Sequence, residues 1–451
     1  MPACTLGPNY HRPPQTLPDQ FRTAPPAAGN ASIGDTRWFE LFRDPTLKEL
    51  IDNALRENFD VRIAAERVIE ARAQVGITRA GLFPTVDATG QFSASQSSAI
   101  GAFPFPGGQP FKTSYTQAGL NFNWEIDLWG RVRRLTEAAR AQYLASEEAR
   151  HGVVLSLVSD VMTGYFALRE QDLELEIAQR TRDAAQQNLR LIELRRERGA
   201  SNALEVHQAE QFLYTATAQI VATQRAIGQE ENALSLLLGK APAAIERGTG
   251  LEQLQPPPDL PPGLPAALLE RRPDIRQAED NLIAANAEIG AARTLFLPQI
   301  SLTGFLGGQS QALLALFSGP ARMANIGPSA TAPIFHAGLR AGLQLTEAQK
   351  TEMLVSYQKS IFTALREVSD ALVAHEKTHQ QRQEEEKLVA ALSESVRLSE
   401  LRYRGGLDSY LQVLDAERNL FGGQLQLAQL RLQELDSVVD LYRALGGGWQ
   451  E

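Results

Sequence analysis

Cysteine is almost absent from this chain of 451 residues, which holds a single one, Cys4. One cysteine excludes an intrachain disulfide framework and any zinc site built from several cysteines. Positive charge is also scarce. The net charge is -9 and the sequence pI is about 5.4, which argues against a nucleic-acid binder, because such a protein needs a basic face. No apolar run approaches the ~18 residues of a transmembrane helix, and no phosphate-binding loop or nucleophile elbow is present.

Proline is missing from two long stretches, since none occurs between Pro110 and Pro242 or after Pro333. Proline breaks helix interiors, so both stretches are open to very long helices. Residues 131–194 and 339–401 are also rich in Ala, Leu, Glu, Gln and Arg, which favour helix. A 60-residue helix is about 90 Å long. A globular core cannot bury such a helix, so it needs partners along its whole length, as in a coiled coil or an α-barrel.

The two halves of the chain repeat one another. Residues 60–90 align without a gap on residues 274–304, at an offset of 214. The tetrapeptide Leu-Thr-Glu-Ala at 135–138 recurs at 345–348, and the pattern R-x-x-x-G-x-x-x-x-L-x-V-x-x-A-E begins at Arg195 and again at Arg402. A repeat this long is not a solenoid unit. It predicts two similar halves around a shared axis.

Before each long helix the hydrophobic period changes from 3.6 to 2. From 118 to 128 every second residue is apolar, and a weaker alternation runs through 86–94, 300–303 and 326–334. This pattern predicts strands with one apolar and one polar face. They could form the half-buried sheet of a soluble protein or part of a membrane β-barrel. Four strands cannot close a barrel, and an open edge in lipid is not viable, so a membrane barrel would need several chains, of which three would give twelve strands.

Each half therefore reads helix, strand, loop, strand, very long helix, turn, helix. The turns fall at Gly199-Ala200-Ser201-Asn202 and at Gly405-Gly406-Leu407-Asp408-Ser409. Glycine after a helix end followed by Asn, Asp or Ser as an N-cap suits such a turn. We expect Gly199 and Gly405 to supply the positive φ.

Segments along the whole chain resemble the TolC-like outer-membrane factor family, in its branch of OprM/NodT-type efflux lipoproteins. The resemblance depends on residues 4–14, 38–51, 83–84, 124–133, 268–275 and 403–418. It implies an α+β membrane protein with an internal tandem duplication. Three chains would form a 12-stranded outer-membrane β-barrel, four strands per chain, continuous with a long periplasmic α-helical barrel.

The resemblance also implies a function, which is the passive exit duct of a tripartite pump for drugs and other toxic compounds. The duct would lie in the outer membrane of a Gram-negative bacterium and extend into the periplasm, with no enzymatic activity, cofactor or metal of its own. The expected partners are two further copies of the chain, a periplasmic adaptor (membrane fusion) protein, an inner-membrane RND-type transporter and outer-membrane lipid, with no nucleic acid. The alternative is the channel of another tripartite export system, such as metal-ion efflux.

By the same resemblance the chain divides into segments. These are a lipidated N-terminal extended segment, 1–45; the periplasmic α-barrel and equatorial region, 46–82, 131–241, 266–297 and 338–445; two β-hairpins, 83–130 and 298–337; a Pro-rich linker, 242–265; and a tail, 446–451. Cys4 follows Met1-Pro2-Ala3, and we expect it to carry the lipid of a processed lipoprotein. The alternative is an unmodified thiol on a flexible tail.

The resemblance places a gate at the periplasmic tip, where copies of Asp415 from three chains would form a ring. Like charges crowded in a constriction repel one another and bind cations. The remaining gate residues are Leu411 as an apolar ring, Gln412 where some relatives carry a second aspartate, and Arg402, Tyr403 and Asp408 in the bonds that hold the tips together. The expected adaptor-docking residues are Gly199, Ala200, Ser201, Gly405, Gly406 and Leu407. The alternative is a solvated helix end with local i, i+4 pairs.

Two other interpretations remain open. His375-Glu376-Lys377-Thr378-His379 matches H-E-x-x-H, the zinc-protease helix motif, but no third ligand is apparent and residues 380–387 are strongly polar. A soluble periplasmic coiled-coil adaptor would explain the long helices. It would not explain the strand hairpins or the repeat of a whole half.

Overall fold

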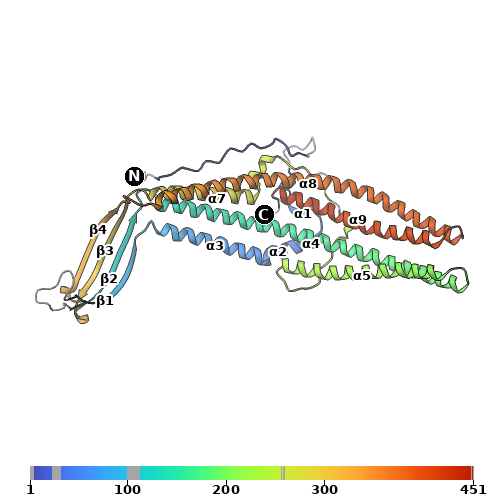
Figure 1. Ribbon diagram of the computed structural model, residues 1–451, viewed down its shortest axis with the longest axis horizontal. Coiled ribbons are helices and arrows are strands. Elements are labelled where there is room, and N and C mark those ends of the chain that lie inside the picture. The colour runs from blue at the N-terminus through green and yellow to red at the C-terminus, as the bar shows by residue number, and fades with distance from the viewer. Residues whose placement is uncertain are drawn as a thin grey trace. The chain divides into compact units, whose positions relative to one another are not determined.

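The computed structural model describes residues 5–22, 32–98, 112–254, 256, 260–447 and 449. The predicted lipidation site, Cys4, lies outside them. The elements of the first half are η1 (Ile33–Asp35), α1 (Trp38–Leu41), α2 (Pro45–Glu57), α3 (Phe59–Ala80), β1 (Thr85–Gln96), β2 (Lys112–Ile126), α4 (Arg131–Glu197) and α5 (Ala203–Leu237). Those of the second half are η2 (Leu251–Gln253), η3 (Pro265–Ala267), α6 (Leu268–Arg271), α7 (Pro273–Thr294), β3 (Gln299–Ser310), η4 (Leu313–Ala315), η5 (Gly319–Ala321), β4 (Arg322–Thr331), α8 (Gly338–Arg404) and α9 (Tyr410–Ala444). Figure 1 labels the main elements.

The predicted duplication is confirmed by the element lengths. Helices α3 and α7 each have 22 residues, α4 and α8 each have 67, and α5 and α9 each have 35. One matched motif is wrong, however. Because α4 and α8 have equal lengths and start at Arg131 and Gly338, the structural offset inside them is 207, whereas the Leu-Thr-Glu-Ala repeat implies 210. An unbroken helix has no place for a three-residue insertion, so that tetrapeptide match is not a structural equivalence.

The chain forms two compact units. Unit 1 comprises Met1–Pro13, Val68–Ser146 and Ala278–Tyr357, and unit 2 comprises Pro14–Arg67, Glu147–Gln277 and Gln358–Glu451. The strands belong to unit 1. The tips of both long helix pairs belong to unit 2.

Unit 1 contains an antiparallel sheet of four strands in the order β1-β2-β3-β4. The register confirms the predicted alternation, because it places Leu120 opposite Leu306 and Gly304 opposite Ile326. One face of the sheet is therefore mainly apolar, and its apolar members are Val86, Ala88, Ala118, Leu120, Phe122, Trp124, Ile126, Ile300, Leu302, Leu306, Ala324, Ile326 and Ala330. The other face is mainly polar and includes Asp87, Thr89, Gln91, Gln117, Asn121, Asn123, Glu125, Ser301, Thr303, Asn325 and Ser329. Both edge strands, β1 and β4, lack a second neighbour within the described chain.

Two tryptophans fix the end of the sheet that continues into helices. The indole Nε1 of Trp124 donates to the carbonyl of Leu82 at 3.0 Å, and that of Trp129 donates to the carbonyl of Pro298 at 2.7 Å. Phe83, between α3 and β1, is 60% exposed. An aromatic group at this level suits the interface between lipid and water.

The start of the described chain is fastened to unit 1 by polar contacts. Arg134 Nε on α4 donates to the carbonyl of Leu6 at 3.0 Å. Glu279 on α7, which is 7% exposed, accepts from the Tyr10 hydroxyl at 3.0 Å and forms an ion pair of 2.6 Å with Arg12. These contacts satisfy a buried carboxylate that would otherwise be costly.

Unit 2 is held by the middle of α4, where Tyr165, Phe166 and Met162 have no exposed surface. The ring of Phe166 lies 4.9 Å from the ring of Phe42, edge to face, so α4 packs against the segment that carries α1 and α2. Full burial of side chains of this size contributes about 1.5–3 kcal/mol each.

A repeated contact in unit 2 joins the end of each shorter helix to the start of another. Asn58 Nδ2 donates to the carbonyl of Leu237, the last residue of α5, at 2.9 Å. Arg272, at the equivalent position in the second half, donates to the carbonyl of Ala444, the last residue of α9, at 2.8 Å. Each donor satisfies a carbonyl that a helix end leaves free.

One described helix, α4, contains an 18-residue stretch long and apolar enough to cross a membrane. That differs from the expectation drawn from the sequence. Half of the stretch is buried inside the protein, however. A core helix passes the same test of length and composition, so the finding is weak evidence for a transmembrane helix.

Candidate functional site: the helical tips and the polar clasp

The two tip turns have the same backbone. In the α4–α5 turn the Ala200 amide donates to the Arg195 carbonyl at 2.7 Å, and in the α8–α9 turn the Leu407 amide donates to the Arg402 carbonyl at 2.9 Å. These are Schellman bonds, which place the preceding residue in the left-handed region. That residue is Gly199, with φ of 73°, or Gly406, with φ of 72°.

The expectation that Gly405 supplies the positive φ is therefore wrong. The Gly405 amide continues the helical pattern and donates to Leu401 at 3.0 Å. The sequence repeat already indicated Gly406 as the residue with positive φ, because it aligns Gly406 with Gly199. The N-caps also differ. Asn202 accepts from the Glu205 amide, whereas Ser409 makes no side-chain capping bond.

The expected tip residues lie at the two turns, and most of them are exposed. Arg402 and Asp408 pair with each other across the α8–α9 turn, with Nε–Oδ2 at 2.5 Å and a second contact of 3.1 Å. These bonds lower the pKa of the Asp408 carboxyl. The expected docking residues are mostly exposed: Leu407 is 72% exposed, Gly199, Ala200, Gly405 and Gly406 are also exposed, and Ser201 is partly exposed.

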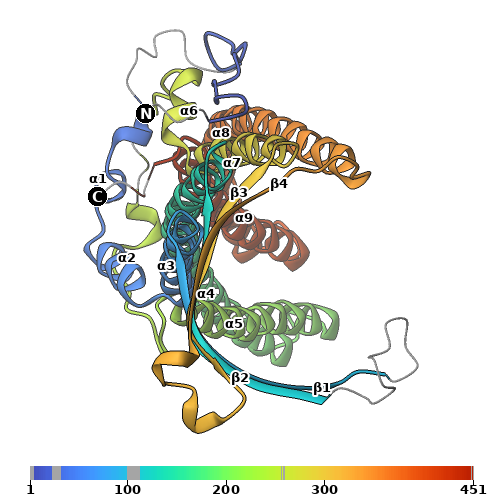
Figure 2. The ribbon, with the colours of Figure 1, turned by 90° about the vertical axis from the view of Figure 1, so that its left-hand side faces the viewer.

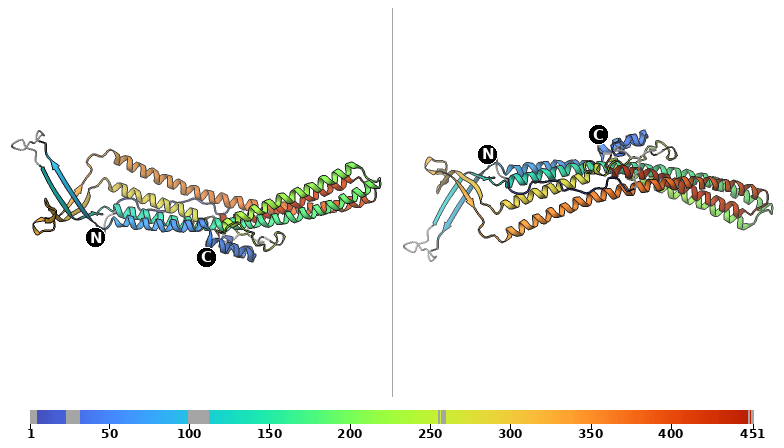
Figure 3. Two further views of the ribbon diagram at one scale, coloured as in Figure 1. Left: turned by 90° about the horizontal axis from the view of Figure 1, so that it is seen from below. Right: turned by 90° about the horizontal axis from the view of Figure 1, so that it is seen from above.

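Tyr403 lies inside its own protomer. It is 7% exposed, its ring lies 5.6 Å from that of Tyr410, and the guanidinium of Arg195 on α4 lies 4.5 Å above the ring. A cation over an aromatic face is attracted to it. Tyr403 therefore joins the α8–α9 hairpin to the α4–α5 hairpin, which run side by side in unit 2 (Figure 3).

Asp415, Leu411 and Gln412 all lie on exposed parts of α9. Leu411 and Asp415 are one turn apart and share a face, and Leu411 is 51% exposed. The Asp415 carboxylate accepts from Asn419 at 3.3 Å, also on α9. These three side chains therefore point away from the packed core of unit 2.

The sequence analysis missed a buried carboxylate beside the tip, Glu417. Its Oε1 accepts a short hydrogen bond from Asn188 of α4, and its Oε2 is buried with no hydrogen-bond partner among the described residues. Burial, with a contribution from Glu400 on α8, raises the pKa of Glu417 to about 7. The alignment of the halves could have identified it, since Glu210 occupies the same position in the first half.

We predict that Glu417→Gln stabilises the tip at high pH only. A carboxyl whose pKa rises on folding makes the folded state more stable as pH falls through about 7, and that contribution is complete below its unfolded value. Glutamine keeps an acceptor for Asn188 but has no charge to bury, so the variant should gain roughly 2 kcal/mol at pH 8 and almost nothing at pH 4. Hydrogen exchange of α8 and α9 at both pH values measures this. Glu210→Gln is the matched control, and equal gains at pH 8 and pH 4 would contradict the prediction.

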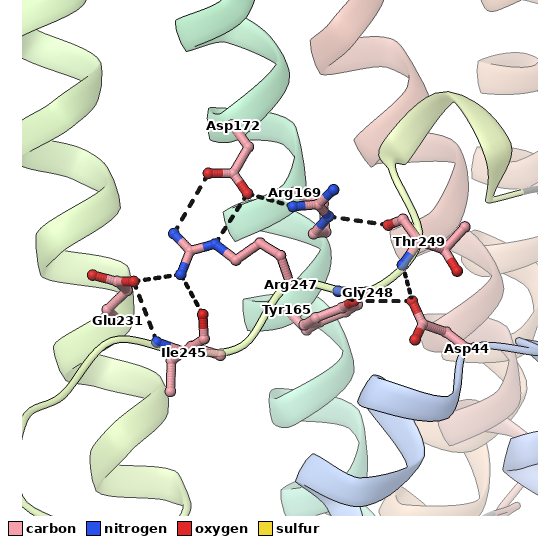
Figure 4. Close-up of polar contacts among 9 residues, drawn as sticks. All are labelled: Asp44, Tyr165, Arg169, Asp172, Glu231, Ile245, Arg247, Gly248 and Thr249. Carbon is pink, nitrogen blue, oxygen red and sulfur yellow. Dashed lines mark hydrogen bonds and ion pairs between the residues drawn. The ribbon is translucent and has the colours of Figure 1, made fainter.

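A second feature that the sequence analysis missed is a polar clasp in unit 2, shown in Figure 4. We define it by Asp44, Tyr165, Arg169, Asp172, Glu231, Ile245, Arg247, Gly248 and Thr249. Asp44 is 2% exposed and caps α2 by accepting from the amides of Thr46 and Leu47 with Oδ1. Its Oδ2 accepts from the Tyr165 hydroxyl and the Thr249 amide, both at 2.9 Å.

The loop after α5 is fixed by the rest of the clasp. Arg247 forms ion pairs with Asp172 at 3.2 Å and with Glu231, and Arg169 donates to the carbonyl of Thr249 at 3.0 Å. The Gly248 amide donates to the Tyr165 hydroxyl at 3.0 Å. A Cβ on Gly248 would lie 2.5 Å from Asp44 Oδ1, so only glycine fits. Burial raises the pKa of Tyr165, which keeps its hydroxyl a donor.

Both histidines of the H-E-x-x-H match lie on α8 and contact side chains of α9. His379 Nδ1 lies 2.6 Å from Glu434 Oε1, its Nε2 lies 2.9 Å from Gln383, and His375 Nδ1 lies 3.1 Å from Ser437 Oγ. Burial lowers the pKa of His375. Both ring nitrogens of His379 are engaged by side chains, and the described part of the chain holds no group of three or more His, Cys, Asp or Glu that could bind a metal.

A hollow with a volume of about 970 Å³ also lies in unit 2. Its charged lining comes from several helices and consists of Asp60, Asp160, Asp274, Glu367, Asp370, Asp440, Arg67, Arg272 and Arg443. It is partly open.

Comparison with known proteins identifies the family. A family model described as outer membrane efflux protein matches residues 50–240 and 264–447. The chain is 41% identical to the solvent efflux pump outer membrane protein SrpC of Pseudomonas putida, over 99% of this chain and 96% of that protein. It is 37% identical to the cation efflux system protein CusC of Escherichia coli, with coverage of 99% and 96%.

Solved structures agree with these relatives. The outer-membrane channel OprN matches with a TM-score of 0.90 at 29% identity, over 99% of this chain and 100% of that one. The open state of the MtrE outer membrane channel of Neisseria gonorrhoeae matches with a TM-score of 0.86 at 32% identity, over 99% of both chains. The predicted family, fold class and outer-membrane location are thereby confirmed. The chain belongs to the outer membrane efflux protein family and is an efflux channel of the Gram-negative outer membrane.

Proposed function

We propose that three copies of the chain close their sheets into one barrel of twelve strands and serve as the exit duct of a tripartite pump. The open sheet carries the proposal. Strands β1 and β4 each present an edge that is unpaired within the described chain, and one face is mainly apolar. Unpaired edges are not viable in lipid, whereas pairing β1 of one copy with β4 of the next removes them all.

The long helices would form the periplasmic part of the duct. An inner-membrane RND-type transporter supplies the energy, and a periplasmic adaptor docks at the tips. The exposed turn residues support a docking role, because Leu407 presents an apolar side chain directly after Gly405 and Gly406. Cys4 would carry the lipid anchor.

The gate in this proposal is a ring of Asp415 from three copies, with Leu411 and Gln412 near it. The exposure of these three residues on α9 supports it. Arg402 and Asp408 stiffen the turn, and Tyr403 holds the hairpins of one protomer together.

For the cargo we propose toxic organic compounds, in keeping with the similarity to a solvent efflux protein. Metal cations are the alternative, in keeping with the similarity to a cation efflux protein. Sensitivity of a deletion strain to solvents and to copper salts separates the two, and sensitivity to copper alone would favour the alternative.

The assembly is tested by the mass of the purified protein in detergent. We expect a particle of three chains, each of 49.4 kDa, because the sheet edges can close only in a ring. A second sample should carry Ala88→Pro, which removes a backbone donor from the edge strand β1. Loss of the trimer in this variant would support the proposal, whereas Ala203→Pro at the first position of α5 should keep it. A parent protein that remains a monomer in detergent would refute it.

A further inference from the structure

The connection between β3 and β4 has an unusual composition. From Ser310 to Ala321 the sequence is SQALLALFSGPA, which contains no charged residue. Hairpin connections are normally built from Gly, Pro, Asn, Asp and Ser. Here Leu313 is 67% exposed, Leu314 is 101% exposed and Phe317 is 87% exposed. Three large apolar side chains on one short segment require a partner.

The place of this segment in unit 1 is defined by the chain path. Strands β1 and β3 follow helices α3 and α7, and strands β2 and β4 lead into helices α4 and α8. All four helix-linked ends therefore lie at one end of the antiparallel sheet. The β3–β4 connection lies at the opposite end, and Figure 2 shows it bulging from the strands. In the proposed barrel that end is the outer rim.

The segment folds onto the apolar face of the sheet. Gly308 shares that face with Leu302 and Leu306, because alternate residues of a strand point the same way. A Cβ on Gly308 would lie only 2.3 Å from the carbonyl oxygen of Leu316. The connection thus lies directly against the apolar face, with Leu316 itself only 5% exposed, and it continues that face outward.

Part of the backbone of the segment is satisfied from within. The amides of Ala315, Leu316, Ser318 and Ala321 donate to the carbonyls of Ala312, Leu313, Ala315 and Ser318, at 3.0 to 3.2 Å. The Ala312 amide donates to Ser310 Oγ at 3.2 Å. Backbone that meets lipid must satisfy its polar groups internally. Two 3₁₀ turns, η4 and η5, satisfy the amides of Ala315, Leu316, Ser318 and Ala321 in this way.

We propose that residues 311–321 are a lipid anchor, with Leu313, Leu314 and Phe317 inserted among the acyl chains of the outer leaflet. The proposal depends on the barrel proposed above. The apolar sheet face would meet lipid, and this segment is continuous with that face. Exposed Arg322, the first residue of β4, adds a positive charge at the same rim, where the phosphate groups of the lipid lie.

The test is a fluorescent depth measurement on the protein in phosphatidylcholine vesicles. Leu314→Cys in a Cys4→Ser background carries one thiol, which is labelled with an environment-sensitive NBD group. We expect a blue-shifted emission that is quenched by lipid with a nitroxide at carbon 5 of the acyl chain and not by aqueous iodide. Phe317→Cys is the second variant, with the same expectation.

Two control positions separate this proposal from the barrel itself. A label at Leu306→Cys, on the apolar face, should be quenched by the nitroxide lipid, and a label at Gln309→Cys, on the polar face, should be quenched by iodide. If Leu306 is not quenched by lipid, the barrel proposal fails. If Leu306 behaves as expected but Leu314 and Phe317 are quenched by iodide, or by neither agent because another copy covers them, only the anchor proposal is overturned.

Discussion

Replacing Asp44 with alanine should lower the free energy of unfolding by about 4 kcal/mol. The carboxylate is 2% exposed and accepts hydrogen bonds from Thr46, Leu47, Tyr165 and Thr249. Loss of the helix cap costs about 1 kcal/mol. The Tyr165 hydroxyl and the Thr249 amide are then left as buried donors without acceptors, at about 1–3 kcal/mol each. Denaturant unfolding of the purified protein in detergent, followed by far-UV circular dichroism, measures the loss.

Two variants resolve the parts of this effect. Asp44→Asn retains the oxygen that caps α2 but replaces the oxygen that faces Tyr165 and Thr249 with a donor, so it should lose about half as much. Asp52→Ala, at an exposed site on the same helix, is the control and should stay within about 0.5 kcal/mol of the parent. A loss in Asp44→Ala no larger than in Asp52→Ala would show that the clasp contributes nothing to stability.

The clasp marks the limit of what the sequence predicts. Strands and long helices could be predicted because their sequence signal is local. The alternation of apolar and polar residues predicted the strands, and the lack of proline together with a helix-forming composition predicted the helices. The clasp joins residues that are distant in sequence, such as Asp44 with Thr249, or Arg247 with Asp172. A lone arginine in a Pro-rich segment carries no periodic signal, so that segment was interpreted only as a linker.

At the tips, too, local features could be predicted from the sequence and contacts between distant residues could not. The repeat motif located both turns correctly, but choosing between Gly405 and Gly406 required the bond from Leu407 to Arg402, which depends on where α8 ends. Glu417 was missed for a different reason. It lies within the resembling segment, and its raised pKa comes from burial against α4 and from Glu400, which sequence spacing does not report.

Contacts between the two hairpins bear on how the proposed gate can open. Within one protomer the two hairpins are joined by Asn188 with Glu417 and by Arg195 with Tyr403. Arg418 of α9 also donates to Gln211 of α5 at 3.0 Å. Asp415, in contrast, has its described contact within α9. We therefore expect the Asp415 side chains to act between copies, and the internal contacts to keep each protomer intact when the tip loosens.

On this reasoning, Asp415→Ala should raise single-channel conductance in planar bilayers and weaken block by multivalent cations. Three carboxylates in a constriction repel one another and together bind a cation. At about 1 kcal/mol for each pair of unit charges close together in water, removing three of them from one site weakens block by roughly 100-fold. The trimer should survive, because Asp415 is exposed and takes no part in the core of unit 2.

The matched controls distinguish charge from shape. Asp415→Asn removes the charge but keeps the side-chain size, so it should lose cation block as fully as alanine. Gln208→Ala changes the equivalent position of the first half and should leave both conductance and block unchanged. If Asp415→Asn retains the parent's block while alanine loses it, the side chain closes the tip by its bulk and the charged ring is wrong. If neither variant differs from the parent, Asp415 does not line the constriction, and the gate lies elsewhere on the tip.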